Sequence, residues 1–171
     1  MGLFAKKPIV LRWSPESDST WEKQKLDATH KPMKHIRCGG VSVMIASLGK
    51  TPDGKLVTDV SVSNYEENAV GFNSGGFGLI CGEIKFPCTN LKVQRGKPDF
   101  LHPETLGGKE VGFRDVILSQ FENASFTVRF DAPVPAEAFV LLVEAKRRSS
   151  PNIVFVTQYE KRELADWGQE G

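Results

Sequence analysis

Histidine and cysteine side chains at short spacing are the first candidates for chemistry in this chain. His35 and Cys38 stand three residues apart, and Cys81 and Cys88 are the other two cysteines. Structural zinc sites present their ligands as close pairs such as Cys-x-x-Cys, and only His35 and Cys38 have such spacing. Cysteine is also among the residue types most often buried in proteins. We therefore predict buried thiols, no metal site and no cofactor.

Nucleophilic catalysis needs a serine or cysteine beside a base. The three histidines, His30, His35 and His102, lie in no recognised motif. The chain has no nucleophile elbow, no His-Glu-x-x-His sequence and no P-loop. Its acidic side chains are scattered along the sequence. These observations predict a protein that is not an enzyme.

Glycine is concentrated between residues 70 and 82, in the sequence Val-Gly-Phe-Asn-Ser-Gly-Gly-Phe-Gly-Leu-Ile-Cys-Gly. Part of this stretch resembles a dinucleotide fingerprint, but a fingerprint must open a helix, and strand-like sequence follows Gly82. One interpretation is a bulged or closely crossed strand. The other is a binding surface on which two phenylalanine rings stack against a ligand or partner while the glycine backbone donates hydrogen bonds. The candidate binding residues are Phe72, Asn73, Gly75, Gly76 and Phe77.

A basic cluster, Lys146, Arg147 and Arg148, stands between two apolar runs and is expected to lie in a turn. One interpretation is a charged hairpin tip that keeps the turn soluble. The other is a contact for phosphate or acidic lipid, which Lys6 and Lys7 would join. Arginine suits phosphate because its planar group can form two parallel hydrogen bonds.

Charge and hydropathy limit the partners. The chain has 22 Lys+Arg against 21 Asp+Glu, so its net charge is +1 and no dedicated nucleic-acid patch is evident. No apolar run reaches the roughly 18–20 residues that span a bilayer, and the first residues lack the apolar core of a secretory signal. With an odd cysteine count of 3, these features predict reduced thiols and a cytoplasmic or intracellular location.

The segments that must position these residues have sequence patterns that predict strands. Residues 41–48 and 55–63 alternate between apolar and polar around a turn sequence, which predicts a hairpin with one solvent-facing side. Residues 138–144 and 152–158 are continuous apolar runs, typical of strands covered on both faces. Residues 94–109 are rich in proline and glycine and predict a long loop.

The predicted fold is all-β with minor α content, an antiparallel β-sandwich or jelly-roll-like domain of about eight or nine short strands. Short helical segments are expected at residues 20–28 and 159–167. Residues 1–40 would form an N-terminal strand and helix arm, packed on the core or extending from it. Residues 41–171 would form a single β-sandwich domain.

Two pieces of the chain resemble known families. Residues 59–72, Asp-Val-Ser-Val-Ser-Asn-Tyr-Glu-Glu-Asn-Ala-Val-Gly-Phe, are similar to a segment of H-type lectins in which a strand leads through a turn to Gly-Phe. Residues 130–142 resemble that family's Phe…Pro…Val stretch, although the two pieces stand in a different order. Residues 140–155, with a short basic N-terminus, are similar to the C-terminal hairpin of rhabdovirus-type matrix proteins. The second resemblance implies self-association, membrane contact and nucleocapsid contact.

The sequence therefore favours a non-enzymatic β-sandwich that acts as a recognition or assembly module through surface contacts and self-association, as a homo-oligomer. One alternative is a viral structural protein, matrix-like or coat-like, that binds membrane or nucleocapsid. Another alternative is a cytosolic glycan-binding lectin. A protein, a glycan and an anionic membrane surface are the partner classes that these hypotheses allow.

Overall fold

A computed structural model describes most of the chain, namely residues 7–26, 33–46, 49–51, 55–96, 104–110, 116–131, 138–148, 150–160 and 165–166. Strands β1–β14 lie in these residues, with one short helix, α1 (Trp21–Leu26), and a 3-10 turn, η2 (Ser74–Gly76). No helix among them is long and apolar enough to cross a membrane. The all-β prediction is confirmed, and the strands outnumber the expectation because several have only two or three residues.

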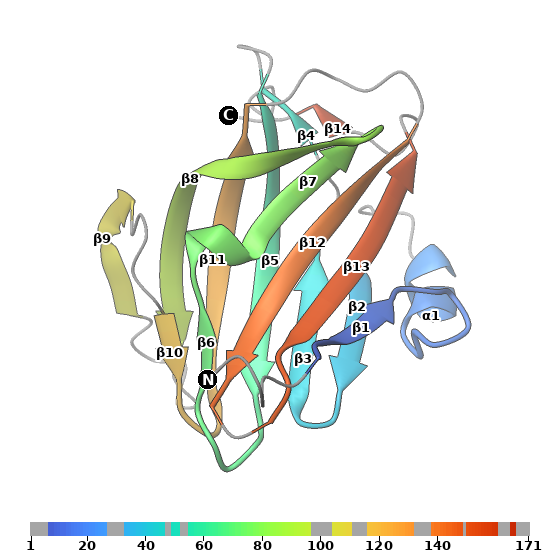
Figure 1. The fold of residues 1–171 in the computed structure, drawn as a ribbon. Helices are drawn as coiled ribbons and strands as arrows, with labels where there is room; N and C mark the ends of the chain where they lie inside the picture. The colour runs from blue at the N-terminus through green and yellow to red at the C-terminus, as the bar shows by residue number, and fades with distance from the viewer. Residues whose placement is uncertain are drawn as a thin grey trace.

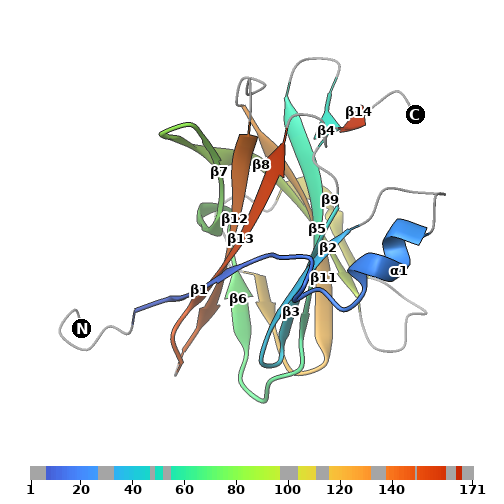
Figure 2. The same ribbon diagram turned by 90° about the vertical axis from the view of Figure 1, so that its right-hand side faces the viewer.

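The strands form two sheets that one long strand joins (Figure 1). The first sheet has the order β1 (Ile9–Arg12), β13 (Ile153–Glu160), β12 (Ala138–Arg147), β7 (Phe77–Cys81) and the first part of β8 (Ile84–Gly96). The second sheet continues from the rest of β8 through β11 (Glu122–Phe130), β5 (Leu56–Asn64), β3 (Val41–Ile45) and β2 (Lys34–Cys38). The two sheets face each other across the core, as in a β-sandwich (Figure 2).

Short strands extend both sheets. β6 (Val70–Phe72) pairs with the end of β12, and β10 (Val116–Leu118) pairs with β6. β4 (Gly49–Lys50) pairs with β5, and β14 (Ala165–Asp166) pairs with β4 in parallel. β9 (Glu104–Glu110) pairs with β8. These pairings leave β6, β10 and the end of β12 as a small three-stranded unit at one end of the sandwich (Figure 1).

Two sequence predictions about local structure were wrong. The expected loop at residues 94–109 is partly strand, because residues 94–96 end β8 and residues 104–109 lie in β9. Pairing between these strands prevails over the weak strand propensity of their glycines. The expected C-terminal helical segment instead ends β13 at Glu160 and contains β14. The inward alternation of β13 continues through Tyr159, which is 2% exposed.

Alternate side chains of the long strands fill the core. Along β5 the predicted pattern holds, with Val60 and Val62 buried and Ser61 and Ser63 facing outward, and β5 pairs with β3 as the predicted hairpin. In β12, however, only one face is fully buried, by Phe139, Leu141, Val143 and Ala145. The residues between them are half-buried, so cover on both faces, as predicted for this run, was wrong for β12.

Residues from the first forty contribute to both sheets. β1 pairs with β13 in parallel, and β2 pairs with β3 in the opposite sheet. Residues 13–26, which follow β1, lie along the open side of the sandwich and include α1, at the position where the sequence predicted a helical segment (Figure 2).

Candidate functional site

The glycine stretch is a bulged strand that follows one edge of β12. β6 pairs with Lys146 and Arg147, whereas β7 pairs with residues 139–143 of the same strand. Between them η2 passes Glu144 closely, since a Cβ added to Gly76 would lie 3.2 Å from the Glu144 carbonyl oxygen. Asn73 closes this turn, because its Oδ1 accepts a hydrogen bond from the Gly76 N–H at 3.1 Å. The glycines therefore permit a close backbone passage.

Phe72 and Phe77 are core residues. They are 0% and 1% exposed, and their ring centroids lie 5.7 and 5.3 Å from that of Phe126. Their burial contradicts the interpretation in which both rings stack on a partner. Four residues, Asn73 and the three of η2, separate the two strands, and their turn lets residues 72 and 77 both point inward. Of the five candidate residues, only Asn73 and Gly75 reach the surface.

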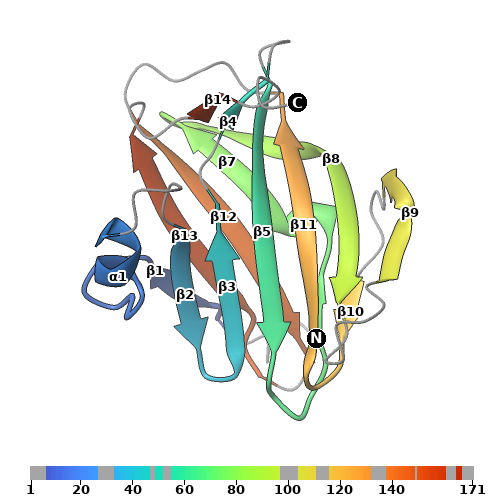
Figure 3. The ribbon, with the colours of Figure 1, turned by 180° about the vertical axis from the view of Figure 1, so that it is seen from behind.

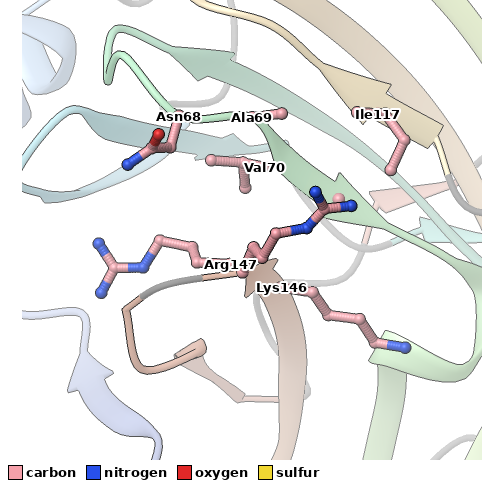
Figure 4. A pocket seen from close by; sticks show the side chains of 8 residues that line it. Asn68, Ala69, Val70, Ile117, Lys146 and Arg147 are labelled. Atoms are coloured by element: carbon pink, nitrogen blue, oxygen red, sulfur yellow. The ribbon is translucent and has the colours of Figure 1, made fainter.

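A pocket of about 460 Å³ lies beside this stretch, on the outer face of β10, β6 and the end of β12 (Figure 4). The strand register places Ile117, Gly71 and Lys146 next to one another. Because Gly71 has no side chain, its backbone forms the floor between the other two. A Cβ at Gly71 would lie 3.1 Å from Ile117 Cδ1 and 4.0 Å from Lys146 Cβ. The remaining lining residues are Asn68, Ala69, Val70, Arg147 and Arg148.

The three basic residues of the pocket differ in their partners. The Arg147 Nη1 group lies 3.2 and 3.3 Å from the two carboxylate oxygens of Glu66, and its Nε donates to the Pro151 carbonyl at 2.8 Å. Its side chain is only 11% exposed. Within the part of the chain that the structure describes, neither Lys146 nor Arg148 forms an ion pair. The available positive charge of the pocket therefore lies on Lys146 and Arg148.

A buried asparagine holds the connections that border the pocket. Asn64 is 0% exposed, and its Nδ2 donates to the carbonyls of Asn68 and Leu118, each at 3.0 Å. Its Oδ1 accepts from the Glu66 N–H at 2.9 Å. The side chain thus satisfies two backbone groups of the connection between β5 and β6 and one at the end of β10. Sequence reasoning missed Asn64, whose only signal was a polar residue at an inward position of an alternating strand.

Lys7 lies near the same end of the sandwich. The Ile9 N–H donates to the Asn152 carbonyl at 2.8 Å, so the chain enters β1 beside the connection between β12 and β13. Lys7 is exposed two residues earlier. Lys6, the other basic residue expected to join the cluster, lies outside the described residues, and so do His30 and His102.

The histidine and cysteine candidates lie in ordinary structural surroundings. The His35 Nε2 atom is 2.6 Å from Ser42 Oγ. Cys38, Cys81 and Cys88 are half-buried rather than fully buried and form no disulfide, and burial raises the pKa of the Cys81 thiol. Among the described residues, no group of three or more His, Cys, Asp or Glu side chains could hold a metal ion.

No protein-family model matches this chain, and no curated protein sequence matches it. Among solved structures it is similar to the secreted protein MPT63 of Mycobacterium tuberculosis, with 8% identity and a TM-score of 0.44, over 91% of this chain and 100% of that one. A PapD-like domain of human CEP192 has 12% identity and a TM-score of 0.34, over 82% and 95% of the two chains. The match to a family 123 glycoside hydrolase from Clostridium perfringens has 11% identity and a TM-score of 0.42, and it covers 70% of this chain but 27% of the enzyme. All of these TM-scores lie below 0.5, so the similarities carry no argument about what this chain binds.

Proposed function

We propose that this protein is a non-enzymatic recognition module that holds an anionic group of its partner in the pocket floored by Gly71. One observation carries the proposal: Lys146 and Arg148 line a pocket in which no described carboxylate pairs with either of them. Arg147, by contrast, is already held by Glu66 and is assigned a structural role.

The shape of the pocket supports the same conclusion. Gly71 leaves room for a group to approach the sheet backbone, with the apolar wall of Ile117 on one side and Lys146 on the other. A phosphate, sulfate or carboxylate at this position would form charge-assisted hydrogen bonds with the two cations, which are stronger than bonds between neutral groups. Ile117 would limit the access of water to one side of those bonds.

A titration with inorganic phosphate, followed by amide chemical shifts of isotope-labelled protein, tests this proposal. Saturable shifts are expected at Gly71 and Lys146, the two residues paired at the floor of the pocket. The double variant Lys146→Gln/Arg148→Gln should lose them. Lys85→Gln/Lys92→Gln is the matched control, since it removes the same charge from two exposed residues of β8. Shifts that are equal in both double variants would refute a specific pocket.

The proposal includes self-association. On the outer face of the first sheet, the exposed Val10 lies beside the half-buried Val154, and the half-buried Leu142 lies beside Val156, which is 6% exposed. Val10 is 54% exposed on the edge strand β1. A group of apolar side chains on an outer sheet face, beside an exposed apolar residue of the edge strand, supports a protein–protein contact at this edge. Light scattering should show an oligomer that Val10→Lys reduces to a monomer, whereas a monomeric mass for the unaltered protein would contradict self-association.

A further inference from the structure

Phe121 occupies a position that its residue type disfavours. It is the third residue of the turn between β10 and β11, which the hydrogen bond from the Glu122 N–H to the Ser119 carbonyl closes at 3.1 Å. Its φ angle is 69°, and it is the one non-glycine residue with positive φ in the described part of the chain. Glycine or asparagine normally occupies such a turn position. Strained residues of this kind tend to cluster at functional sites.

The Phe121 ring is also exposed, by 57% of the residue's surface. The neighbouring connection carries a second exposed aromatic residue, Tyr65, which is 51% exposed. Backbone and side-chain bonds tie the two turns together, since Phe121 N–H donates to the Asn64 carbonyl at 2.6 Å and Gln120 Nε2 donates to the Tyr65 carbonyl at 3.2 Å. Two aromatic residues are thus presented to solvent on adjoining turns.

These turns and the Gly71 pocket share one end of the sandwich, which we call the hairpin end. It carries the turn between β2 and β3, the connection between β5 and β6, the turn between β10 and β11, and the connection between β12 and β13 (Figures 1 and 3). Asn68 and Ala69, which follow Tyr65, line the pocket, and so does Arg148 from the last of these connections. The aromatic and basic groups therefore lie at the same end of the sandwich.

The hairpin end carries a small excess of positive charge. Lys146 and Arg148 line the pocket, and Arg37 is exposed in β2 next to the turn that leads to β3. The charge of Glu66 is compensated by Arg147. Two carboxylates oppose these cations, namely Glu67, which is exposed on the same connection as Tyr65, and the half-buried Glu122, which follows Phe121 and accepts a hydrogen bond from the Ser119 N–H at 2.6 Å.

We infer that the hairpin end docks onto an anionic phospholipid bilayer, an inference that rests on the anionic-group pocket proposed above. Phe121 and Tyr65 lie in the interfacial layer of the lipid, where aromatic side chains are favoured. Lys146 and Arg148 contact lipid phosphates, because an anionic leaflet attracts basic side chains near its surface. A bilayer would contact both the exposed rings and the available cations, whereas a small soluble anion in the pocket would contact only the cations.

Co-sedimentation of the full chain with phosphatidylcholine vesicles, with and without phosphatidylserine, tests the inference. Binding is expected only when phosphatidylserine is present. Phe121→Asn keeps a residue that tolerates positive φ and removes the ring, so the protein should fold and bind about tenfold more weakly. Lys146→Gln and Arg148→Gln should each weaken binding about fivefold, and Glu67→Gln should strengthen it by a similar factor.

Ile84→Asn is the matched control for the ring. Ile84 is 62% exposed, but it begins β8 at the opposite end of the sandwich (Figure 1). Its substitution should leave vesicle binding unchanged. Equal binding to vesicles with and without phosphatidylserine, no binding to either, or an equal loss for Ile84→Asn and Phe121→Asn would each overturn the inference.

The phosphate titration separates this inference from the function on which it depends. If phosphate shifts Gly71 and Lys146 but the vesicles do not bind, the bilayer inference fails and the anionic pocket stands. If phosphate produces no saturable shift at these residues, the pocket itself fails, and the docking inference fails with it.

Discussion

The ammonium group of Lys34 lies 4.2 Å from the centroid of the Tyr159 ring, across the open side of the sandwich. The Trp13 ring lies 4.6 Å from the same group, and the Gln158 carbonyl accepts a hydrogen bond from it at 2.8 Å. Lys34 belongs to the second sheet, whereas Gln158 and Tyr159 belong to the first. Because Lys34 is only 5% exposed, its charge is shielded from water and its attraction to the rings is strengthened. This cluster joins the two sheets where backbone pairing does not.

A double-mutant cycle should detect this connection as a coupling between Lys34 and Tyr159. Tyr159→Leu removes the ring and the hydrogen bond from its hydroxyl to the Ala46 carbonyl at 3.2 Å, and it should lower the free energy of unfolding by about 2–4 kcal/mol. Lys34→Met in the same protein should show a coupling energy of about 1–2 kcal/mol with Tyr159→Leu in urea unfolding.

The control for this cycle pairs Lys34→Met with Val128→Ala. Val128 is buried in β11, which is separated from β2 by β5 and β3 in the second sheet. These two changes should add within about 0.5 kcal/mol. Additivity for Lys34 and Tyr159 as well would show that the cation and ring contribute independently to stability.

Alternation of apolar and polar residues was sufficient to predict the main strands, because successive side chains of a strand point to opposite faces and only one face is buried. The alternation of Val60 and Val62 with serine predicted the pairing of β3 with β5. In β12 the same reasoning was misled, because Val140 and Leu142 are apolar although they lie on the outer face. An apolar outer face and a buried one look alike in a single sequence.

The pocket could not be predicted in the same way, because strand register assembles it. Gly71, Ile117 and Lys146 become neighbours only when β10, β6 and β12 pair in their observed register. The basic cluster was recognised from its composition. The sequence could not predict which of its three residues is available to a ligand, because Arg147 pairs with Glu66, which lies far away in the sequence.

Acid should weaken the packing of the N-terminal arm through Asp18. Burial acts to raise the pKa of Asp18, but hydrogen bonds from Thr20, Trp13 Nε1 and the His35 N–H together outweigh it and hold the pKa below its ordinary value. A carboxylate with a lowered pKa contributes stability above the unfolded-state value, about 3.9, and this stability is lost as the pH falls through the folded-state pKa.

Asp18→Asn should therefore cost about 1–2 kcal/mol of unfolding free energy at pH 7, because hydrogen bonds to the charged carboxylate are lost. Urea unfolding at neutral pH and at a pH below the lowered folded-state pKa of Asp18 would measure the difference between variant and unaltered protein. The two proteins should converge in acid. A difference that is the same at both pH values would assign Asp18 a role independent of its charge.

Replacing Asn64 by leucine should destabilise the hairpin end. The substitution leaves the Asn68 and Leu118 carbonyls and the Glu66 N–H without their partner, at a cost of about 3 kcal/mol for the buried groups. Thermal unfolding would measure the loss. Asn64→Asp should cost at least as much, since it keeps the acceptor for the Glu66 N–H but places a buried carboxylate oxygen against the two carbonyls. If leucine cost less than about 1 kcal/mol, the hydrogen bonds would not be the main contribution of this side chain.

Two glycines on the same edge should respond differently to alanine. At Gly71 the nearest atom is the end of the flexible Ile117 side chain, so Gly71→Ala should change stability by less than about 1 kcal/mol and abolish the phosphate-dependent shifts by filling the pocket floor. At Gly76 the neighbours include the Glu144 backbone oxygen at 3.2 Å, and Gly76→Ala should cost about 1–3 kcal/mol. Unfolding curves and the phosphate titration on both variants would show whether Gly71 mainly affects phosphate binding and Gly76 mainly affects stability.

The positive φ of Phe121 predicts that a residue better suited to this conformation would raise the free energy of unfolding. A positive φ costs a non-glycine residue roughly 1–2 kcal/mol, and asparagine tolerates it better than phenylalanine. Since 57% of Phe121 is already exposed, losing the ring sacrifices little packing. Phe121→Asn should therefore unfold at the same or a higher urea concentration than the unaltered protein, with a gain of up to about 1 kcal/mol.

Phe121→Ala, which loses the ring but not the strain, should be less stable than the asparagine variant. The opposite order would mean that the φ of 69° carries no cost in this turn, and strain at Phe121 would then not support a functional role for its exposed ring.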